Sequence, residues 1–210
     1  MAKSDITKEK IIAAAKTCYK KYGYKASSMD TIANEAGISK SLLVHYFSKK
    51  HVILTTINKA YLDSIYDCML NLMPQDPLTV MFATYTVFFL NILSDSATRR
   101  LWFESMLRHD VGAESYNNSD KVYMPVFYKY NIPISSQELA VRKIQIMGAS
   151  REITYSVVHN LMDMSDSEYI EYGLKHSAML LGAPNSDIAD SLKKCSDVLE
   201  KIDYSSFRLL

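Results

Sequence analysis

Two short helical patterns, at about residues 29–36 and 40–47, are separated by a turn that contains Gly37. Ser28 and Ser39 directly precede them and are predicted N-caps, because a serine oxygen can accept a hydrogen bond from a free first-turn N–H. Glycine suits a sharp change of backbone direction. A helix, a glycine-bearing turn and a second short helix predict a helix-turn-helix, for which the alternative is an αα-hairpin of purely structural use.

A third helical pattern, residues 8–22, precedes this pair, so the segment is predicted to be a three-helix unit. In its last helix, the spacing of Leu43 and Phe47 predicts that these two side chains pack against the other helices. The residues expected to face outward are Ser41, Val44 and His45. A recognition helix presents small and polar side chains of this kind to the major groove.

The charges of the chain are distributed unevenly. Residues 1–55 hold ten lysines, no arginine and four acidic residues, for a net charge of +6, whereas the remainder has a net charge of −5. A basic N-terminal segment on an acidic remainder suggests that only this segment meets a polyanion. An ordinary surface decorated with lysines accounts for the charge equally well.

A series of short motifs extends this prediction to a family. In chain order they are Thr7 and Ile11, Tyr22-Gly23, Ser27-Ser28-Met29, Ile32-Ala33, Ala36-Gly37-Ile38-Ser39-Lys40, His45-Tyr46-Phe47 and Lys49-Lys50. Together they resemble the N-terminal domain of the tetracycline-repressor (TetR) family. The resemblance implies a helix-turn-helix DNA-binding domain at residues 1–50 and a ligand-binding and dimerisation domain at residues 51–210. It also implies a homodimer that binds double-stranded operator DNA and a small-molecule effector.

The resemblance and the helix-turn-helix pattern together indicate a set of DNA-binding residues. These are Ser28, Met29, Ser39, Lys40, Ser41, Leu42, Val44, His45, Tyr46, Lys49 and Lys50. The lysines flank the third helix at both ends, where phosphates would lie. Members of the family usually carry a tyrosine where this chain has Val44, so one phosphate contact is in doubt. Val44 is expected to contact a thymine methyl group instead.

The remainder of the chain is also predicted to be helical, which makes the fold class all-α with about nine or ten helices. The helices are expected at residues 50–73, 78–93, 96–109, 115–130, 136–163, 167–181 and 186–202. No apolar run approaches the roughly 18 residues that span a bilayer, and the N-terminus lacks an apolar signal-peptide core. Three scattered cysteines fit a reducing compartment. We therefore expect a cytoplasmic protein without membrane contact.

Large aromatic and methionine side chains are unusually frequent after residue 55 and exceed what one buried face per helix requires. Tyrosine and methionine suit the lining of a cavity for a small, mostly apolar ligand, although each could equally be a core residue. The predicted ligand-binding residues are Tyr66, Tyr85, Phe89, Trp102, Met106, Tyr123, Phe127, Met147, Arg151 and Tyr155. Arg151 could bind an anionic ligand if its side chain faced the cavity.

The helices at 136–163 and 167–181 have apolar residues on more than one face, so they must be buried on more than one side. In the family the corresponding pair forms a four-helix dimer interface. The interface residues that we predict from it are Ile153, Val157, Ile170, Gly173, Leu174, Ser177 and Leu181. The helix at 186–202 has heptad spacing and could pack within the chain or against a partner.

The motifs of common enzyme active sites are missing from the sequence. It has no Gly-rich phosphate loop, no HExxH and no GxSxG, and its histidines and cysteines lack metal-ligand spacing. Glu104 and Arg108 have the i, i+4 spacing of an intrahelical ion pair. We therefore expect neither an enzyme nor a cofactor or metal site. The leading hypothesis is a repressor released from DNA by an effector, and the alternative is a helical small-molecule or metal-binding protein that does not use its N-terminal head.

Overall fold

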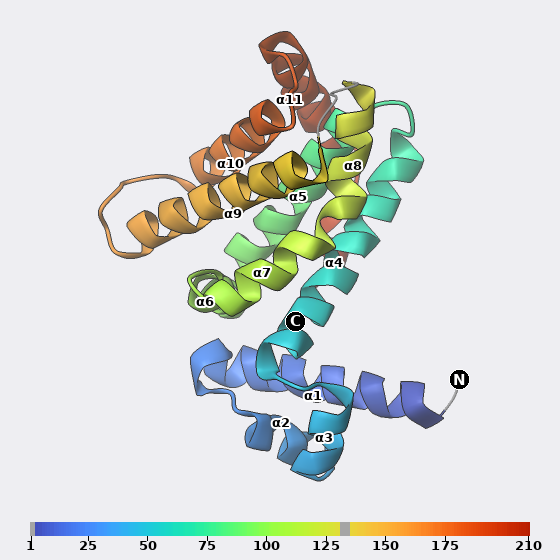
Figure 1. Ribbon diagram of the computed structural model, residues 1–210, viewed down its shortest axis with the longest axis vertical. Coiled ribbons are helices and arrows are strands. Elements are labelled where there is room, and N and C mark those ends of the chain that lie inside the picture. The colour runs from blue at the N-terminus through green and yellow to red at the C-terminus, as the bar shows by residue number, and fades with distance from the viewer. Residues whose placement is uncertain (1–2, 131–134) are drawn as a thin grey trace.

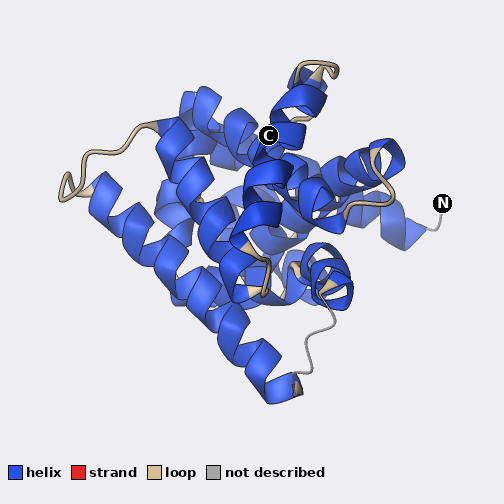
Figure 2. Cartoon of the chain, turned by 90° about the horizontal axis from the view of Figure 1, so that it is seen from above, coloured by secondary structure: helices blue, strands red, loops and turns tan. Residues whose placement is uncertain are grey.

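The computed structural model describes residues 3–130 and 135–210, and every regular element in them is helical (Figure 1). The prediction of an all-α fold is confirmed, and the view in Figure 2 likewise shows no strand in the described ranges. These ranges hold eleven α-helices and a short 3-10 helix, one α-helix more than the upper end of our prediction. The α-helices are α1 (Lys3–Ala26), α2 (Met29–Glu35), α3 (Lys40–Tyr46), α4 (Lys50–Leu72), α5 (Pro77–Ser94), α6 (Ser96–Met106), α7 (His109–Asn118), α8 (Asp120–Lys129), α9 (Ser136–Val158), α10 (Asp166–Leu180) and α11 (Asn185–Leu199).

Helices α1, α2 and α3 form a compact N-terminal unit, which we call the head, below the remaining helices in Figure 1. The two predicted caps are present: Thr31 N donates to Ser28 Oγ at 3.0 Å, and Leu42 N donates to Ser39 Oγ at 3.2 Å. Gly37 has a φ of +61°, a left-handed conformation that glycine adopts without a side-chain clash. Local sequence signals thus account for the turn between α2 and α3.

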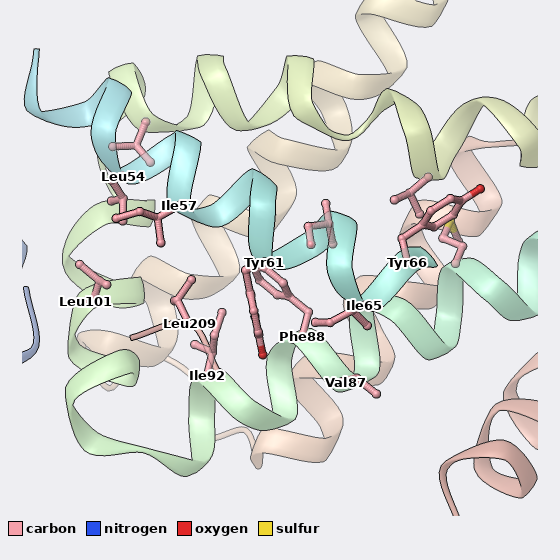
Figure 3. Packing of buried hydrophobic residues seen from close by; sticks show 14 of the residues in the cluster. Leu54, Ile57, Tyr61, Ile65, Tyr66, Val87, Phe88, Ile92, Leu101 and Leu209 are labelled. Carbon is pink, nitrogen blue, oxygen red and sulfur yellow. The ribbon is translucent and has the colours of Figure 1, made fainter. Parts of the chain in front are cut away.

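Helix α4 runs from the head into the rest of the chain, which we call the body, and packs along α5. Figure 3 shows their contact, where the rings of Tyr61 on α4 and Phe88 on α5 lie 5.2 Å apart between centroids. Asp76 caps α5 by accepting a hydrogen bond from Thr79 N. The expectation that no apolar run approaches the length needed to span a bilayer was wrong for α5, which alone among the described helices is long and apolar enough to span a membrane. However, 61% of it is buried within the protein. Such burial is typical of a core helix, because the apolar surface is already covered by protein.

Two predicted helix boundaries were wrong. The segment 96–130 forms three helices where we expected two, because Arg108 has an extended backbone (φ −97°, ψ 128°) and a new helix begins at His109. Helix α9 ends at Val158, five residues before the predicted end, and Asn160 then takes a positive φ of +55°. The serine that caps α10 follows only at residue 165, so the segment between α9 and α10 is a loop.

The last helix packs within the chain, which decides between the two alternatives left open by its heptad spacing. Ile188 and Cys195 of α11 are buried against the core, and α11 contacts α5 along its length. Cys195 Sγ donates a hydrogen bond to Thr86 Oγ1 on α5 at 3.6 Å. The apolar face of α11 is therefore covered by its own chain.

Candidate functional site

The surface of α3 has the orientation that the sequence predicts. Leu43 and Phe47 are buried, with 0% and 2% of their surface exposed, and α3 packs against α2. Ser41, Val44 and His45 are exposed on the other side. Because all three are compact, a flat or grooved partner can approach the α3 backbone closely.

The other residues of the predicted DNA-binding set surround this face. Ser28, Ser39, Lys40, Leu42 and Lys49 are exposed, and Met29 and Tyr46 are half-buried. Lys40 pairs with Asp30 at 2.8 Å, but both side chains are largely exposed, so the pair is weak and can exchange for a phosphate. Ser28 and Ser39 sit at helix N-termini, where backbone N–H groups favour anions.

Lys50 lies elsewhere than predicted. Its Nζ donates to Tyr24 O at 2.6 Å and to Ser27 O at 2.7 Å, and it lies 4.1 Å from the centroid of the Tyr24 ring. Burial lowers the pKa of this ammonium group. Lys50 therefore ties the end of α1 to the start of α4 instead of extending toward a phosphate, because the carbonyls at the end of α1 lack helical partners.

A second junction joins the head to the body through α6. Glu104 Oε2 accepts a hydrogen bond from Lys25 N at 2.9 Å, and Arg100 donates to Lys20 O at 3.1 Å. Gly23, at φ +78°, lies so close that a Cβ atom there would be 2.8 Å from Glu104 Oε2. The predicted ion pair of Glu104 with Arg108 is not formed, since Arg108 pairs with Asp110 at 2.9 Å. Both α4 and α6 therefore connect the head to the body.

The body contains a partly open cavity of about 110 Å³. Rings from α5 and α6 form one wall, where Phe89 and Trp102 meet edge to face with centroids 5.2 Å apart. The lining residues are Asn58, Lys59, Leu62, Tyr85, Phe88, Phe89, Trp102, Met106, Asn118, Ser119, Tyr123, Ile146, Met147, Ser150, Ile153, Tyr169, Gly173, Leu174, His176 and Ser177. A mostly apolar cavity with a few polar groups is the usual form of a small-molecule site.

Six of the ten predicted ligand-binding residues line this cavity: Tyr85, Phe89, Trp102, Met106, Tyr123 and Met147. The other four lie elsewhere. Tyr66 and Phe127 are buried in the core, so their bulk reflects packing. Arg151 contacts His109 at 2.8 Å, and Tyr155 is 45% exposed with its ring against that of His159. These last two face away from the cavity because α9 turns that side outward.

The predicted dimer residues lie on the inner face of α9 and α10 in the single chain. Ile153, Gly173, Leu174 and Ser177 line the cavity, Ile170 and Leu181 are buried, and Val157 is half-buried. Exposed apolar residues lie on the outer side instead, and we call them the outer stripe: Val141, Ile144, Tyr155, Val158, Tyr172 and Met179. Both faces are apolar at helical spacing, so the sequence pattern did not distinguish them.

The polar groups near Trp102 form a closed network. Trp102 Nε1 donates to Tyr169 Oη at 3.3 Å, and Tyr169 Oη lies 2.8 Å from Thr154 Oγ1. Burial raises the pKa of Tyr169, so this phenol is uncharged at neutral pH. In the described part of the chain, no group of three His, Cys, Asp or Glu side chains could hold a metal ion.

Sequence reasoning did not assign several lining residues to the cavity. Tyr169 belongs to an apolar pattern that equally describes a core, and Asn58 lies in a helix without any motif around it. Asn118 and Ser119 come from the junction between α7 and α8, a break that was not predicted. Only the tertiary contact of α4, α7 and α9 brings these residues to one cavity.

Comparisons with known proteins agree with this geometry. Residues 11–56 match the family described as bacterial regulatory proteins, tetR family. No curated protein sequence matches the chain significantly.

Similar solved structures cover nearly the whole chain. RolR without ligand has a TM-score of 0.56 at 15% identity and covers 90% of this chain and 96% of its own. RolR in complex with resorcinol has a TM-score of 0.56 at 14% identity, covering 91% of this chain and 94% of its own. Thermus thermophilus FadR, a TetR-family repressor in complex with lauroyl-CoA, has a TM-score of 0.50 at 15% identity, covering 92% and 93%. At such identities the likeness concerns the fold.

The family match covers most of α1, all of α2 and α3 and the start of α4, which are the elements that form the helix-turn-helix. The body has the helical fold of solved regulators that carry the same kind of head. Residues 11–56 therefore form a helix-turn-helix head that matches the tetR family of bacterial regulatory proteins, and the chain is a DNA-binding transcriptional regulator.

Proposed function

We propose that the protein is a homodimeric repressor that binds an inverted-repeat operator and is released by a small, largely apolar effector. Residues 1–50 are the DNA-binding domain, and residues 51–210 bind the effector and form the dimer. The observation that carries the proposal is the compact outward face of α3, Ser41, Val44 and His45, with Leu43 and Phe47 buried behind it. This is the arrangement in which a recognition helix enters a major groove. Catalysis forms no part of the proposal.

The outer stripe supports the dimer. Residues 144, 148, 151, 155 and 158 follow steps of four, three, four and three along α9, the spacing of a helix–helix seam. Gly148 lies in this seam, and a Cβ atom there would meet nothing within 4 Å in the single chain, which leaves room for a close crossing by a partner helix. Exposed apolar residues that recur along one side of a helix are typical of an interaction surface.

The cavity and the two junctions support release by an effector. Trp102 and Met106 line the cavity from α6, and Arg100 and Glu104 on the same helix bind the backbone of α1. A ligand that prefers one position of α6 or α4 therefore shifts the position of the head. Bound resorcinol and lauroyl-CoA in RolR and FadR support a small-molecule effector for this fold.

Selection of bound DNA from a random pool tests the function and finds the operator together. We expect an enriched inverted repeat whose half-site centres are separated by a multiple of about 10.5 base pairs, because a dimer places its two recognition helices on one side of the duplex. His45→Ala should alter the enriched sequence, since His45 is exposed on the recognition face. If no motif is enriched and binding does not depend on salt, the alternative of a small-molecule-binding protein with an unused head becomes the better description.

Lys49 and Lys50 are adjacent lysines in different surroundings, so substituting each one tests whether its charge contributes to DNA binding or to stability. Lys49 is exposed, so Lys49→Ala should weaken binding to all sequences and reduce the slope of log affinity against log salt by about 1 per half-site. Lys50→Met should instead lower the melting temperature, because it removes the hydrogen bonds to Tyr24 and Ser27. Thermal melts and binding titrations at several salt concentrations separate the two effects. Equal changes in salt slope for both variants would contradict the buried role of Lys50.

A further inference from the structure

One of the described residues that line the cavity, Asn58, has a buried side-chain oxygen without a hydrogen-bond partner. Asn58 Oδ1 is shielded from solvent and accepts no hydrogen bond. Among the buried side-chain atoms of the described residues that lack a partner, it is the one on a cavity-lining residue. An amide oxygen buried without a donor loses its hydrogen bonds to water and gains nothing in return. Because Asn58 lines the cavity, a rotation of its carboxamide would present this oxygen to a donor on a bound ligand.

Other polar side chains around the cavity are already engaged. Ser177 Oγ donates to Gly173 O at 2.7 Å, and Ser150 Oγ donates to Ile146 O at 2.9 Å. Tyr169 is held by Trp102 and Thr154, as described above. The carboxamide of Asn58 therefore differs from these neighbours, whose polar groups are satisfied within the chain.

The remaining wall restricts the kind of molecule that can supply the donor. Phe88 and Phe89 both lie edge to face with Trp102, at centroid distances of 5.7 and 5.2 Å, and such rings pack well against another flat ring. A cavity of about 110 Å³ is of the same order as an engineered cavity of about 150 Å³ that binds benzene. Lys59 pairs with Asp63, so its charge is already compensated and the apolar walls favour an uncharged ligand.

We propose that the cavity binds an uncharged single-ring aromatic molecule that carries an O–H or N–H group, and that this group donates to Asn58 Oδ1. The proposal rests on the proposed function, because it names the chemical class of the effector. Asn58 is eight residues after the first residue of α4, about two helical turns from the head. The ligand would therefore be bonded to one of the two helices that reach the head.

Matched ligands test the hydrogen bond without any mutation. We would titrate the purified protein with 4-ethylphenol, with its methyl ether 4-ethylanisole and with ethylbenzene, by calorimetry and by Trp102 fluorescence. The phenol should bind at least tenfold more tightly than the ether or the hydrocarbon, because only the phenol supplies a donor to the buried oxygen. Equal binding of the phenol and the ether, or no binding of any of the three, would overturn the proposal.

The Asn58→Leu variant then tests whether Asn58 causes the preference for the phenol. Leucine has the same number and branching of side-chain heavy atoms and needs no hydrogen bond, so the variant is expected to fold, which a thermal melt checks. Ethylbenzene should bind it as well as or better than wild type, and the advantage of the phenol should be lost. Phe89→Ala is the control for the wall and should weaken all three ligands. A phenol preference that persists in Asn58→Leu would refute the role of Asn58.

Operator release is measured separately, so that the two proposals can fail independently. A donor-dependent affinity that leaves DNA binding unchanged would support the ligand class and contradict the proposed effector role. DNA release by an unrelated charged or extended molecule, with no affinity for 4-ethylphenol, would support the regulator and refute the ligand class.

Discussion

Replacing Ile144 or Tyr172 by glutamate is expected to convert the proposed dimer into a folded monomer. Both residues belong to the outer stripe, and both are 62% exposed in the single chain. The charge therefore costs the monomer little. In a two-fold symmetric interface each substitution occurs twice, and burying an unpaired carboxylate costs about 3–5 kcal/mol. The dissociation constant of the dimer should rise at least a hundredfold.

Leu174→Glu is the contrasting variant on the inner face of α10. Leu174 is only 5% exposed and lines the cavity, so a glutamate there would be buried in the monomer itself. We expect a loss of about 3–5 kcal/mol in the free energy of unfolding, with a large fall in melting temperature or failure to fold.

Sedimentation velocity and thermal melts on the same samples distinguish these outcomes. Ile144→Glu and Tyr172→Glu should sediment as monomers with a native circular dichroism spectrum. If both remain dimers of normal stability, the interface is not on the outer stripe. A stable, folded Leu174→Glu would in turn contradict the inner position of that residue.

Gly23→Ala is expected to destabilise the protein by roughly 1–3 kcal/mol, the usual strain of a backbone conformation that is nearly exclusive to glycine. Gly23 has φ +78° and ψ 179°. The new Cβ atom would also lie 2.8 Å from Glu104 Oε2, so Glu104 would have to move and its bond with Lys25 N would break. The variant therefore combines strain with loss of the junction between α1 and α6.

Gly37→Ala is the matched control, because it introduces strain without a clash. Gly37 has φ +61°, and a Cβ atom there would lie 3.7 Å from its nearest neighbour, Lys10 Nζ, at the end of a flexible side chain. We expect a smaller loss of unfolding free energy, about 1 kcal/mol. Urea denaturation of both variants measures the difference, and an equal loss would show that the clash with Glu104 is absorbed easily.

The Glu104→Ala variant removes the hydrogen bond between α6 and α1 without straining the backbone at Gly23. Its hydrogen bond with Lys25 N is exposed, so stability should change by less than about 1 kcal/mol. The ratio of operator affinities with and without effector should fall, because α6 would no longer fix the position of α1. An unchanged ratio would leave α4 as the path between cavity and head.

The head was predictable from the sequence because its signals are local. Ser28, Ser39 and Gly37 act on the backbone within a few residues of themselves, and the spacing of Leu43 and Phe47 defines the buried side of one short helix. Caps and helical periodicity do not depend on distant contacts. The same applies to the all-α fold class.

Three other properties depend on residues that are far apart in the chain. They are the side of α9 and α10 that meets the core, the hydrogen-bond partners of Lys50, and the lack of a partner for Asn58 Oδ1. Helices α9 and α10 are apolar on two sides, so periodicity supports either orientation until α4, α5 and α6 occupy one of them. A lysine side chain can extend toward solvent or inward, and Tyr24 O is 26 residues away in the chain from Lys50. Asn58 Oδ1 has no hydrogen-bond partner because the packed helices bring no donor close to it. Each of these properties is a consequence of packing between helices, which no local pattern contains.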